Sequence, residues 1–574
     1  MAVRTLRQIR LREHQLFLAL TIIVGVLGGL SAVMFTVAID RVTRLLFGLD
    51  PSAVRLFLVP TLVSLATGAL LAWVFPGVRG SGVPQTEAAF HLQSGIIPRR
   101  VPLGKFLMGV LCIGSGHSMG REGPSVQIGA GLASIAGQWL RLPPSRIKDL
   151  VPVGAAGALA AAFNTPVAAV LFALEEIIGD MNASLLGSAV VASVASVVVE
   201  RSILGNEPLF HVPAYHLQHP AELLAYAALG IIGGIVSLIF CKGLLGLRRG
   251  FMALPDWTKP WQPAVGGLAI GALLIVLPEI MGVGYEYVDQ ALNGGLLMRT
   301  MVVLCALKLV ATVVSYASGN AGGIFGPSLY IGAMAGGAIG TVVHRFAPLQ
   351  TAEPGAYALV GMGTLFAGII RAPMTSVFMI FEITQDYQIL VPLMVANLLS
   401  FVISRRFQPV PVYHALLRQD QIHLPSSESR VMSPTWTASD VMGPHAEFVP
   451  QDRTVGAVWE QARTDGGGPY LIGTPEQLIG ILTRDRLMSA VDDGRSSELV
   501  GSLVETSVVH AHPDHPSDVV LERLAQSGGL LPIVSREQAR STVGVVTLDH
   551  IMRFVRRRRR GAAAASQRAS RVVH

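Results

Sequence analysis

A charged pair between two apolar segments is the feature that most constrains this chain. Residues 120–124, with the sequence GREGP, lie between the apolar runs 106–113 and 126–139. Ionisable side chains at membrane depth usually line a functional cavity, and Pro124 suits the first turn of a helix, where its missing N–H is not needed. The pattern predicts a helix that begins at this motif, inside the membrane. Its free N–H groups and positive dipole end favour an anion, and Glu122 is an anion that the protein itself supplies.

The composition indicates a membrane protein. Hydrophobic residues make up 51% of the 574 residues and charged residues only 14%, which is typical of an all-α polytopic membrane protein and not of a soluble enzyme. The 61 glycines and 34 prolines exceed what simple spanning helices need, so we expect broken and re-entrant helices. Cys112, Cys241 and Cys305 lie in apolar segments, so we expect neither a disulfide framework nor a metal site. The net charge of +7 is concentrated at the chain ends, which indicates contact with the membrane surface and not with nucleic acid.

The apolar segments fall into two halves. A basic stretch, residues 1–14, precedes an apolar segment, 16–38, that is too long for the core of a signal peptide. The positive-inside bias predicts a cytoplasmic N-terminus. The membrane region expected at 15–420 has halves of about 15–205 and 219–420, each with long segments followed by short, half-spanning ones. Matching halves indicate an internal structural repeat with the site at its interface.

The chain becomes polar after the membrane region. We expect a linker at residues 421–436 and two similar α/β units at 437–492 and 499–556, each reading helix, strand, turn, strand, helix. A unit of this length needs a partner to bury its apolar face. The tail, residues 557–574, is rich in arginine and alanine, and we expect it to be disordered.

Four motifs, in their order along the chain, resemble those of the CLC family of chloride channels and chloride/proton antiporters. They are GSGVP at residues 80–84, GREGP at 120–124, GGIFGP at 322–327, and Tyr413 near the end of the last membrane segment. The resemblance covers residues 15–420 and implies a CLC-type inverted repeat and a homodimer with a separate ion pathway in each subunit. The polar region resembles the pair of cytoplasmic CBS domains that often follows the membrane part in this family.

The resemblance implies an anion site made of neutral donors. It assigns chloride binding to the hydroxyls of Ser81 and Tyr413 and to the backbone N–H groups of Ile324 and Phe325. A neutral donor desolvates chloride without trapping it, and conduction needs binding that is also easy to leave. Each residue also has an ordinary interpretation: the serine as a helix N-cap, the two amides as the start of a buried helix, and the tyrosine as an interfacial aromatic residue.

Two glutamates are the candidate proton carriers. By the resemblance, ionised Glu122 competes with chloride for the outer part of the pathway, and protonated Glu122 swings away and carries a proton. Glu176 then occupies the internal proton-acceptor position, where channel members usually have a valine-like residue. The ordinary interpretations are a first-turn glutamate that complements the helix dipole and a snorkelling helix end. Arg121 and Lys105 are expected only to keep the local potential positive.

Three further charges lie in apolar surroundings and need partners. We expect Glu175 to be structural. Glu87 is expected to pair with Glu176 or with a base, and Lys308 with Glu382.

The CBS-like units carry two pairs of a threonine and an aspartate, Thr483 with Asp485 and Thr547 with Asp549. These pairs resemble the positions that contact the ribose and phosphate of adenine nucleotides. A threonine and an aspartate in a turn are also ordinary structural choices. An adenine nucleotide is therefore an optional ligand, and we expect no required cofactor.

The leading hypothesis is a secondary-active antiporter that exchanges chloride for protons. The Glu176 carboxylate favours it over the alternative, a passive voltage- or pH-gated chloride channel of the same family. A fluoride exporter is disfavoured because Ser81, Pro124 and Tyr413 keep the chloride-type pattern. A third hypothesis is an enzyme or nucleotide sensor that uses the CBS-like region. No nucleophile–base constellation or metal cluster supports catalysis, and nucleotide sensing would act as regulation of transport. We expect a multi-pass protein in the lipid bilayer of a bacterial inner (plasma) membrane, with both termini cytoplasmic. Its expected partners are chloride, protons and a second copy of the chain, without nucleic acid.

Overall fold

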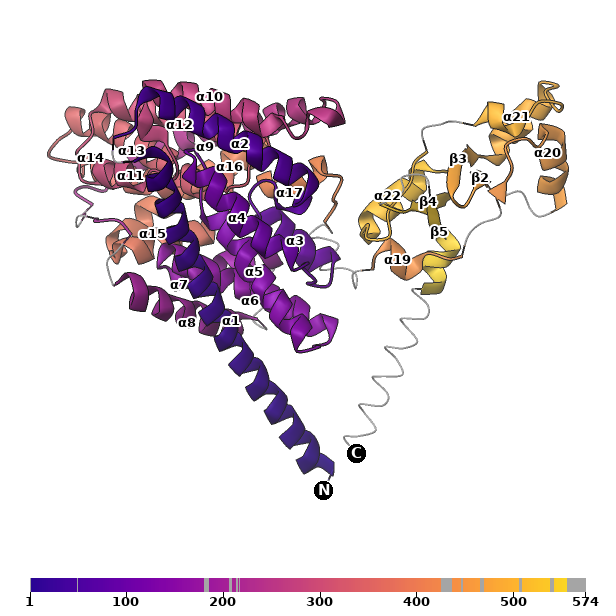
Figure 1. Ribbon diagram of the computed structural model, residues 1–574, viewed down its shortest axis with the longest axis horizontal. Coiled ribbons are helices and arrows are strands. Elements are labelled where there is room, and N and C mark those ends of the chain that lie inside the picture. Colours follow the sequence, from indigo (N-terminus) through magenta and orange to yellow (C-terminus); the bar gives the residue numbers. More distant parts are fainter. Residues whose placement is uncertain are drawn as a thin grey trace. The chain divides into compact units, whose positions relative to one another are not determined.

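The computed structural model comprises two compact units, Met1–Gln421 and Ile422–His574. Figure 1 shows their helices and strands, coloured from indigo to orange in the first unit and from orange to yellow in the second. The tail and most of the linker predicted above lie outside the described residues. The structure describes the chain except for residues 1, 49, 180–184, 206–208, 213–214, 216, 425–435, 445–447, 465–468, 505–507, 537–540 and 555–574, and except for the side chains of 2–15 and 518.

Within these described residues, seven segments of the membrane unit are long and apolar enough to cross a bilayer. The first helix, α1, extends from Ala2 to Phe47, beyond the predicted segment 16–38 at both ends. The flanking residues are mostly arginine, leucine and glutamine, which favour a helix although they are not all apolar. The other spanning segments contain α2 (Ala53–Trp73), α8 (Leu186–Leu204), α9 (Glu222–Met252), α12 (Met298–Ala317), α13 (Phe325–Phe346) and α16 (Leu390–Phe407).

Shorter helices complete the membrane unit, as the expected broken segments require. They are α3 (Val83–Leu92), α4 (Arg100–Gly114), α5 (Glu122–Trp139), α6 (Pro144–Phe163), α7 (Pro166–Phe172), α10 (Gln262–Val276), α11 (Tyr285–Leu292), α14 (Pro354–Ile369), α15 (Pro373–Thr384) and α17 (Val412–Gln419). A π-helical turn, η2 (Ala173–Ile178), continues α7. Short 3₁₀ turns occur at η1 (Pro76–Val78), η3 (Asp256–Thr258), η4 (Pro278–Ile280) and η5 (Tyr387–Ile389).

Glycines bring one helix pair in each half into backbone contact. In the first half Gly154 of α6 lies so close to α5 that an added Cβ would be 2.5 Å from the Cβ of Ala133. In the second half an added Cβ on Gly361 of α14 would be 2.9 Å from the Cα of Gly336 in α13. Small residues at such contacts are the usual basis of helix packing in membranes. Close helix contacts at glycine therefore occur in the core of both halves.

The two halves also cap each other's helices. Glu382 of α15 accepts hydrogen bonds from two backbone N–H groups at the start of α7, at 2.9 and 2.7 Å. Glu175, in the turn that continues α7, accepts from two N–H groups at the start of α15, at 3.3 and 2.9 Å. Each carboxylate satisfies donors that a helix start leaves open. Glu175 thus has the structural contact expected of it, whereas the predicted Lys308–Glu382 pair is wrong, because both oxygens of Glu382 are bound to α7.

The C-terminal unit contains two small sheets packed on one shared apolar cluster. The first sheet has the order β1-β2-β3, with β1 parallel and β3 antiparallel to β2, and the second is the antiparallel pair β4-β5. Leu471 and Leu530, one from each sheet, lie in the shared cluster. The elements are α19 (Ala438–Val441), β1 (Phe448–Val449), α20 (Val455–Thr464), β2 (Tyr470–Thr474), β3 (Gln477–Leu482), α21 (Arg484–Asp492), η6 (Val500–Leu503), α22 (Ser517–Gln526), β4 (Leu530–Val534) and β5 (Thr542–Thr547), followed by helical residues 548–554.

Candidate functional site

Backbone hydrogen bonds join the three glycine-rich motifs at the centre of the membrane unit. The Gly80 N–H donates to the Asn320 carbonyl at 3.2 Å, and the Gly322 N–H donates to the Gly80 carbonyl at 3.1 Å. Gly120 and Gly323 exchange two hydrogen bonds at 2.7 and 2.8 Å. A Cβ on Gly323 would lie only 3.1 Å from the Gly120 carbonyl oxygen, so glycine permits the approach. Segments far apart in the sequence thus meet at one place.

Two buried hydroxyls at this place make no hydrogen bond to any residue that the structure describes. Ser81 and Tyr413 both have 0% exposed surface, and neither side-chain oxygen has a hydrogen-bond partner among the described residues. The two hydroxyls are close enough to interact with each other, but their geometry is not that of a hydrogen bond. Ser81 is not the N-cap considered above, because Gly82 caps α3. A buried hydroxyl left unpaired costs about 1–3 kcal/mol, so this pair of donors suits an acceptor that comes from outside the protein.

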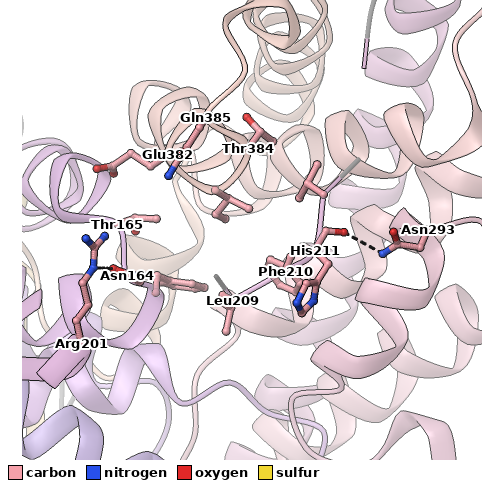
Figure 2. Close-up of a pocket in the computed structure, with 13 residues that line it drawn as sticks. Asn164, Thr165, Arg201, Leu209, Phe210, His211, Asn293, Glu382, Thr384 and Gln385 are labelled. Carbon is pink, nitrogen blue, oxygen red and sulfur yellow. Dashed lines mark hydrogen bonds between the residues drawn. The ribbon is translucent and has the colours of Figure 1, made fainter. Parts of the chain in front are cut away.

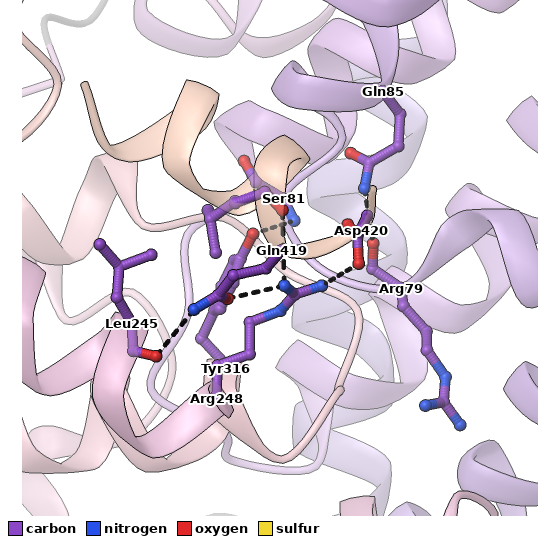
Figure 3. Close-up of polar contacts among 9 residues, drawn as sticks. Arg79, Ser81, Gln85, Leu245, Arg248, Tyr316, Gln419 and Asp420 are labelled. Atoms are coloured by element: carbon purple, nitrogen blue, oxygen red, sulfur yellow. Dashed lines mark hydrogen bonds and ion pairs between the residues drawn. The ribbon is translucent and has the colours of Figure 1, made fainter. Parts of the chain in front are cut away.

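A buried lysine supports the loop that carries Ser81. The Lys105 ammonium donates to the carbonyls of Val78 and Gly80 at 3.0 and 2.5 Å, and its side chain is 0% exposed. The Ser81 N–H donates to the Tyr316 hydroxyl at 3.4 Å (Figure 3). The lysine therefore holds the loop that carries the serine.

An arginine anchors α17, the helix that carries Tyr413. The Arg248 guanidinium of α9 donates to the Gln419 side-chain oxygen at 2.8 Å and to the Asp420 carboxylate at 2.6 Å. The Gln419 amide in turn donates to the Leu245 carbonyl at 2.9 Å, and Figure 3 shows these contacts side by side. Charge-assisted hydrogen bonds of this kind are stronger than neutral ones. They tie α17 to α9 and so restrict where the Tyr413 hydroxyl can lie.

Glu122 places a carboxylate at the N-terminus of α13. It is the first residue of α5, as predicted, and its side chain is 0% exposed. One carboxylate oxygen accepts from the Gly326 N–H at 3.1 Å, and the other accepts from the Tyr285 hydroxyl at 2.5 Å. Ile324 and Phe325 are the N-cap and first residue of α13, so their N–H groups have no partner within that helix. The carboxylate thus occupies a position that favours an anion.

Tyr285 is the site residue that the sequence analysis missed. It is the first residue of α11, and the Arg121 guanidinium lies over its ring, 5.5 Å from the ring centre. The available signal is the glycine-rich break before it, with Gly282 and Gly284 both at positive φ. That break ends the apolar segment 263–277 and starts a new helix, but it belongs to none of the four motifs.

Glu176 lies in the π-helical turn that continues α7. Its side chain is 7% exposed, and one buried carboxylate oxygen has no hydrogen-bond partner among the described residues. Glu87, Glu175 and Arg371 interact with it electrostatically. The carboxylate of Glu87 is paired with the His414 imidazole at 2.6 Å. Of the two partners expected for Glu87, Glu176 or a base, the structure therefore shows the base. π-turns are frequent at functional sites.

Aromatic rings pack beside the candidate site, and two cavities are lined by neighbours of Glu122. The Phe325 ring packs on Phe163, 4.9 Å between ring centres, and Phe163 also contacts the Tyr285 ring. A cavity of about 470 Å³ is lined by Arg121 and Tyr285 among others. A second cavity, of about 620 Å³, is bordered by Phe163 and by the polar residues labelled in Figure 2, where Asn164, Thr165 and Arg201 lie opposite Phe210, His211 and Asn293.

The four candidate nucleotide-binding residues lie at the strand–helix junctions of the C-terminal unit. Thr483 is the N-cap of α21, and Asp485 lies exposed in its first turn. Thr547 ends β5 and accepts from the His550 N–H at 3.3 Å. Asp549 is paired with Arg553 at 2.6 Å. In the part of the chain that the structure describes, no group of three His, Cys, Asp or Glu side chains is placed to hold a metal ion.

Comparison with known proteins identifies the family. The family model described as voltage gated chloride channel matches residues 63–405, more than half of the chain. The chain belongs to this CLC family. The resemblance predicted from the four motifs is thereby confirmed, and the family is one of channels and transporters, not of enzymes. A CBS domain model matches residues 500–557, within the C-terminal unit.

Curated relatives of this CLC protein match its membrane region. A chloride channel protein ClcB-like of Ralstonia nicotianae is 32% identical over 72% of this chain and 100% of the relative. The H(+)/Cl(-) exchange transporter ClcA of Vibrio campbellii is 31% identical over 69% of this chain and 88% of the relative.

Solved CLC structures confirm the predicted fold. A slow cyanobacterial Cl⁻/H⁺ antiporter has a TM-score of 0.64 and 28% identity, over 70% of this chain and 97% of that one. A eukaryotic CLC transporter, at 20% identity and a TM-score of 0.62, covers 92% of this chain and 97% of its own, and shows the shared fold. The protein is a helical CLC membrane protein with a sheet-containing C-terminal region.

Proposed function

We propose that this protein is a secondary-active antiporter that exchanges chloride for protons through a pathway in each subunit. The observation that carries the proposal is the Glu122 carboxylate, bound at the start of α13 by the Gly326 N–H at 3.1 Å. The Ile324 and Phe325 amides and the Ser81 and Tyr413 hydroxyls are the neutral donors proposed for chloride. Such donors bind an anion reversibly, as conduction requires.

Exchange follows when chloride and the Glu122 carboxylate compete for the same donors. Ionised Glu122 is itself an anion and occupies the helix start. Once protonated, it loses the charge that the helix N-terminus favours, leaves, and lets chloride enter while it carries a proton. Arg121 and Lys105 then act only through their positive charge, because neither lies among the proposed donors.

Glu176 supports coupled exchange over the alternative, a passive voltage- or pH-gated channel. Its buried carboxylate oxygen, which has no hydrogen-bond partner in the described part of the chain, is suited to take up a proton. Its π-turn differs from an exposed, snorkelling helix end. The names of the Vibrio relatives and of the cyanobacterial structure also point to chloride/proton exchange.

The remaining parts of the proposal concern assembly and location. We infer a homodimer in a bacterial inner membrane with both termini cytoplasmic, and a first CBS domain at residues 437–492 that precedes the one matched at 500–557. Adenine nucleotide on Thr483, Asp485, Thr547 and Asp549 remains a proposed regulatory ligand. Thr547 and Asp549 contact His550 and Arg553 in the helical segment that follows β5. Such contacts are also made by residues with a purely structural role.

Proton uptake by proteoliposomes under a chloride gradient, with the voltage clamped near zero by an ionophore, tests the proposal. We expect uphill proton movement in the wild type. In Glu122→Gln and in Glu176→Gln it should fall by roughly a hundredfold while chloride still flows, because a positioned proton carrier contributes on that order. Glu286→Gln, which removes an exposed acid bordering the same cavity as Tyr285, is the matched control and should retain coupling. Chloride flow without proton movement in the wild type would contradict antiport and support the alternative, a passive chloride channel.

A further inference from the structure

The hydrogen bond from Tyr285 gives the second oxygen of the Glu122 carboxylate a protein donor. One oxygen is held by the backbone N–H of Gly326 and the other by the phenol hydroxyl, at 3.1 and 2.5 Å. The first donor belongs to the α13 helix start, which chloride also uses under the proposed function. The second donor is a side chain from a different element, α11, and it is the shorter contact.

The position of Tyr285 is fixed independently of Glu122. Its ring packs edge-on against Phe210, with 5.2 Å between ring centres. Gly284, at φ +81°, turns the chain into α11 immediately before it. The Lys308 ammonium holds the preceding loop through the carbonyls of Ile280 and Gly282, at 2.9 and 2.7 Å. The hydroxyl is therefore presented to the carboxylate by surrounding structure and does not have to be ordered by the contact itself.

A phenol that donates to a carboxylate favours the ionised form. Hydrogen bonds to an ionised acceptor are roughly twice as strong as those between neutral groups, so protonation of Glu122 weakens the contact. The contact must also break when the side chain leaves the pathway. Other charged or titratable groups lie close to this pair. Arg121 lies over the Tyr285 ring and interacts with Glu200, and Tyr413 interacts electrostatically with Glu122. Asp40, Glu286 and Tyr287 line the same cavity as Tyr285.

We propose that Tyr285 is a positioning residue that holds ionised Glu122 in the anion pathway and thereby sets both the pH range and the rate of chloride exchange. The inference rests on the proposed function, in which Glu122 leaves the pathway on protonation. It assigns to α11 a role that the four sequence motifs do not contain. It also predicts that this chain exchanges chloride more slowly than it would without the hydroxyl.

Tyr285→Phe tests the inference, because it removes one oxygen and keeps the ring contacts. Chloride efflux from proteoliposomes is measured from pH 4 to 8, with proton uptake in parallel. We expect the pH at half-maximal chloride flux to rise by roughly one unit, which corresponds to tenfold easier protonation, and flux at pH 7 to increase. Tyr287→Phe is the matched control, since Tyr287 is in the same helix, lines the same cavity and does not bond to Glu122.

A double-variant comparison separates this role from simple packing. In a Glu122→Gln background, where no carboxylate remains, Tyr285→Phe should leave chloride flux and its pH profile unchanged. Coincident profiles of Tyr285→Phe and the wild type would overturn the inference. The inference would also be overturned if Tyr285→Phe had an equal effect in the Glu122→Gln background, or if the Tyr285→Phe protein no longer folded. Either result would show that the tyrosine acts through packing.

The two proposals fail in different ways. If the wild type moves chloride without protons, the antiport proposal fails. The chloride pH profile of Tyr285→Phe still decides the positioning role, because it needs only competition between Glu122 and chloride. If the wild type exchanges both ions and only the Tyr285→Phe shift is missing, antiport stands and the positioning role fails.

Discussion

Two buried lysines bind backbone carbonyls in loops beside the candidate site. Lys105 and Lys308 are both 0% exposed, and each donates to two backbone carbonyls of a loop. The first loop leads into Ser81 and the second into Tyr285. A lysine used in this way orders the loop, and under the proposed function the neutral hydroxyls and amides are left to bind the mobile ion.

The unpartnered hydroxyl of Tyr413 leads to a prediction on chloride affinity. Tyr413→Phe removes a donor that has no protein partner in the described residues. A hydrogen bond to a charged group contributes about 1.5–3 kcal/mol, so chloride should bind at least roughly tenfold more weakly. Isothermal titration of the detergent-solubilised protein with chloride measures this.

Tyr330→Phe is the control for that measurement. Tyr330 is also fully buried, but its hydroxyl contacts the Glu279 carbonyl at 3.4 Å. Its removal should leave the chloride affinity unchanged. Equal affinities of Tyr413→Phe and the wild type would remove Tyr413 from the chloride site.

At the scale of elements, reciprocal capping explains why α7 and α15 can be short. Each helix start receives a carboxylate from the other helix, Glu382 for α7 and Glu175 for α15. Backbone donors without partners are costly in a membrane. The two helices therefore depend on each other, and a truncated half would expose both.

The glycine contact between α5 and α6 leads to a prediction on folding. Gly154→Leu puts a large side chain where even a Cβ would be 2.5 Å from Ala133 Cβ. The backbones must separate, which we expect to cost more than about 3 kcal/mol and to abolish the monodisperse peak in size-exclusion chromatography after detergent extraction. Gly246→Leu on α9, where an added Cβ meets nothing within 4 Å, should elute as the wild type does. Equal elution of both variants would contradict the packing.

At the scale of the whole molecule, the membrane unit and the C-terminal unit differ in what stabilises them. The first is held by close backbone contacts and buried caps, and the second by two small sheets on a shared cluster. The cyanobacterial antiporter structure is covered over 97% of its length by 70% of this chain. The cyanobacterial structure therefore matches only part of this chain, whereas the eukaryotic CLC transporter structure covers 92% of it.

A buried histidine leads to the prediction that acid destabilises the C-terminal unit. Burial lowers the pKa of His515 from 6.5 to about 3, and the charge of Arg523 adds to this effect. The folded unit keeps the imidazole neutral, whereas the unfolded chain takes up a proton below pH 6.5. Stability is therefore lost as the pH falls from 6.5 towards 3, by roughly 1 kcal/mol at pH 5.5.

Amide hydrogen exchange of the full chain, read by mass spectrometry, measures this loss separately in each unit. Between pH 7 and 5.5, and after correction for the intrinsic exchange rate, protection of β4 and β5 should fall. His515→Asn retains an acceptor for the His512 N–H but does not titrate in this range, so it should reduce that fall. An undiminished fall in His515→Asn would assign the acid sensitivity to other groups.

Local sequence patterns were enough to predict the family, the broken helices and the helix start at Glu122, because glycine, proline and charge inside apolar segments have few structural uses. The C-terminal α/β region was visible for the same reason, as a change from apolar runs to short alternating ones. The roles of Ser81, Glu122, Glu176 and Tyr413 stay predictions. For these residues the structure adds burial and the partners each one has or lacks.

The amino-acid sequence alone determined that this chain is a membrane protein of the CLC family with an anion-favouring helix start, since those properties follow from composition and from contiguous motifs. Only the tertiary structure decided which side chains share a contact: Tyr285 with Glu122, Glu382 with α7 and not with Lys308, and Glu87 with His414. These pairs join residues far apart in the chain. Their distances depend on how the two halves pack, which no local pattern specifies.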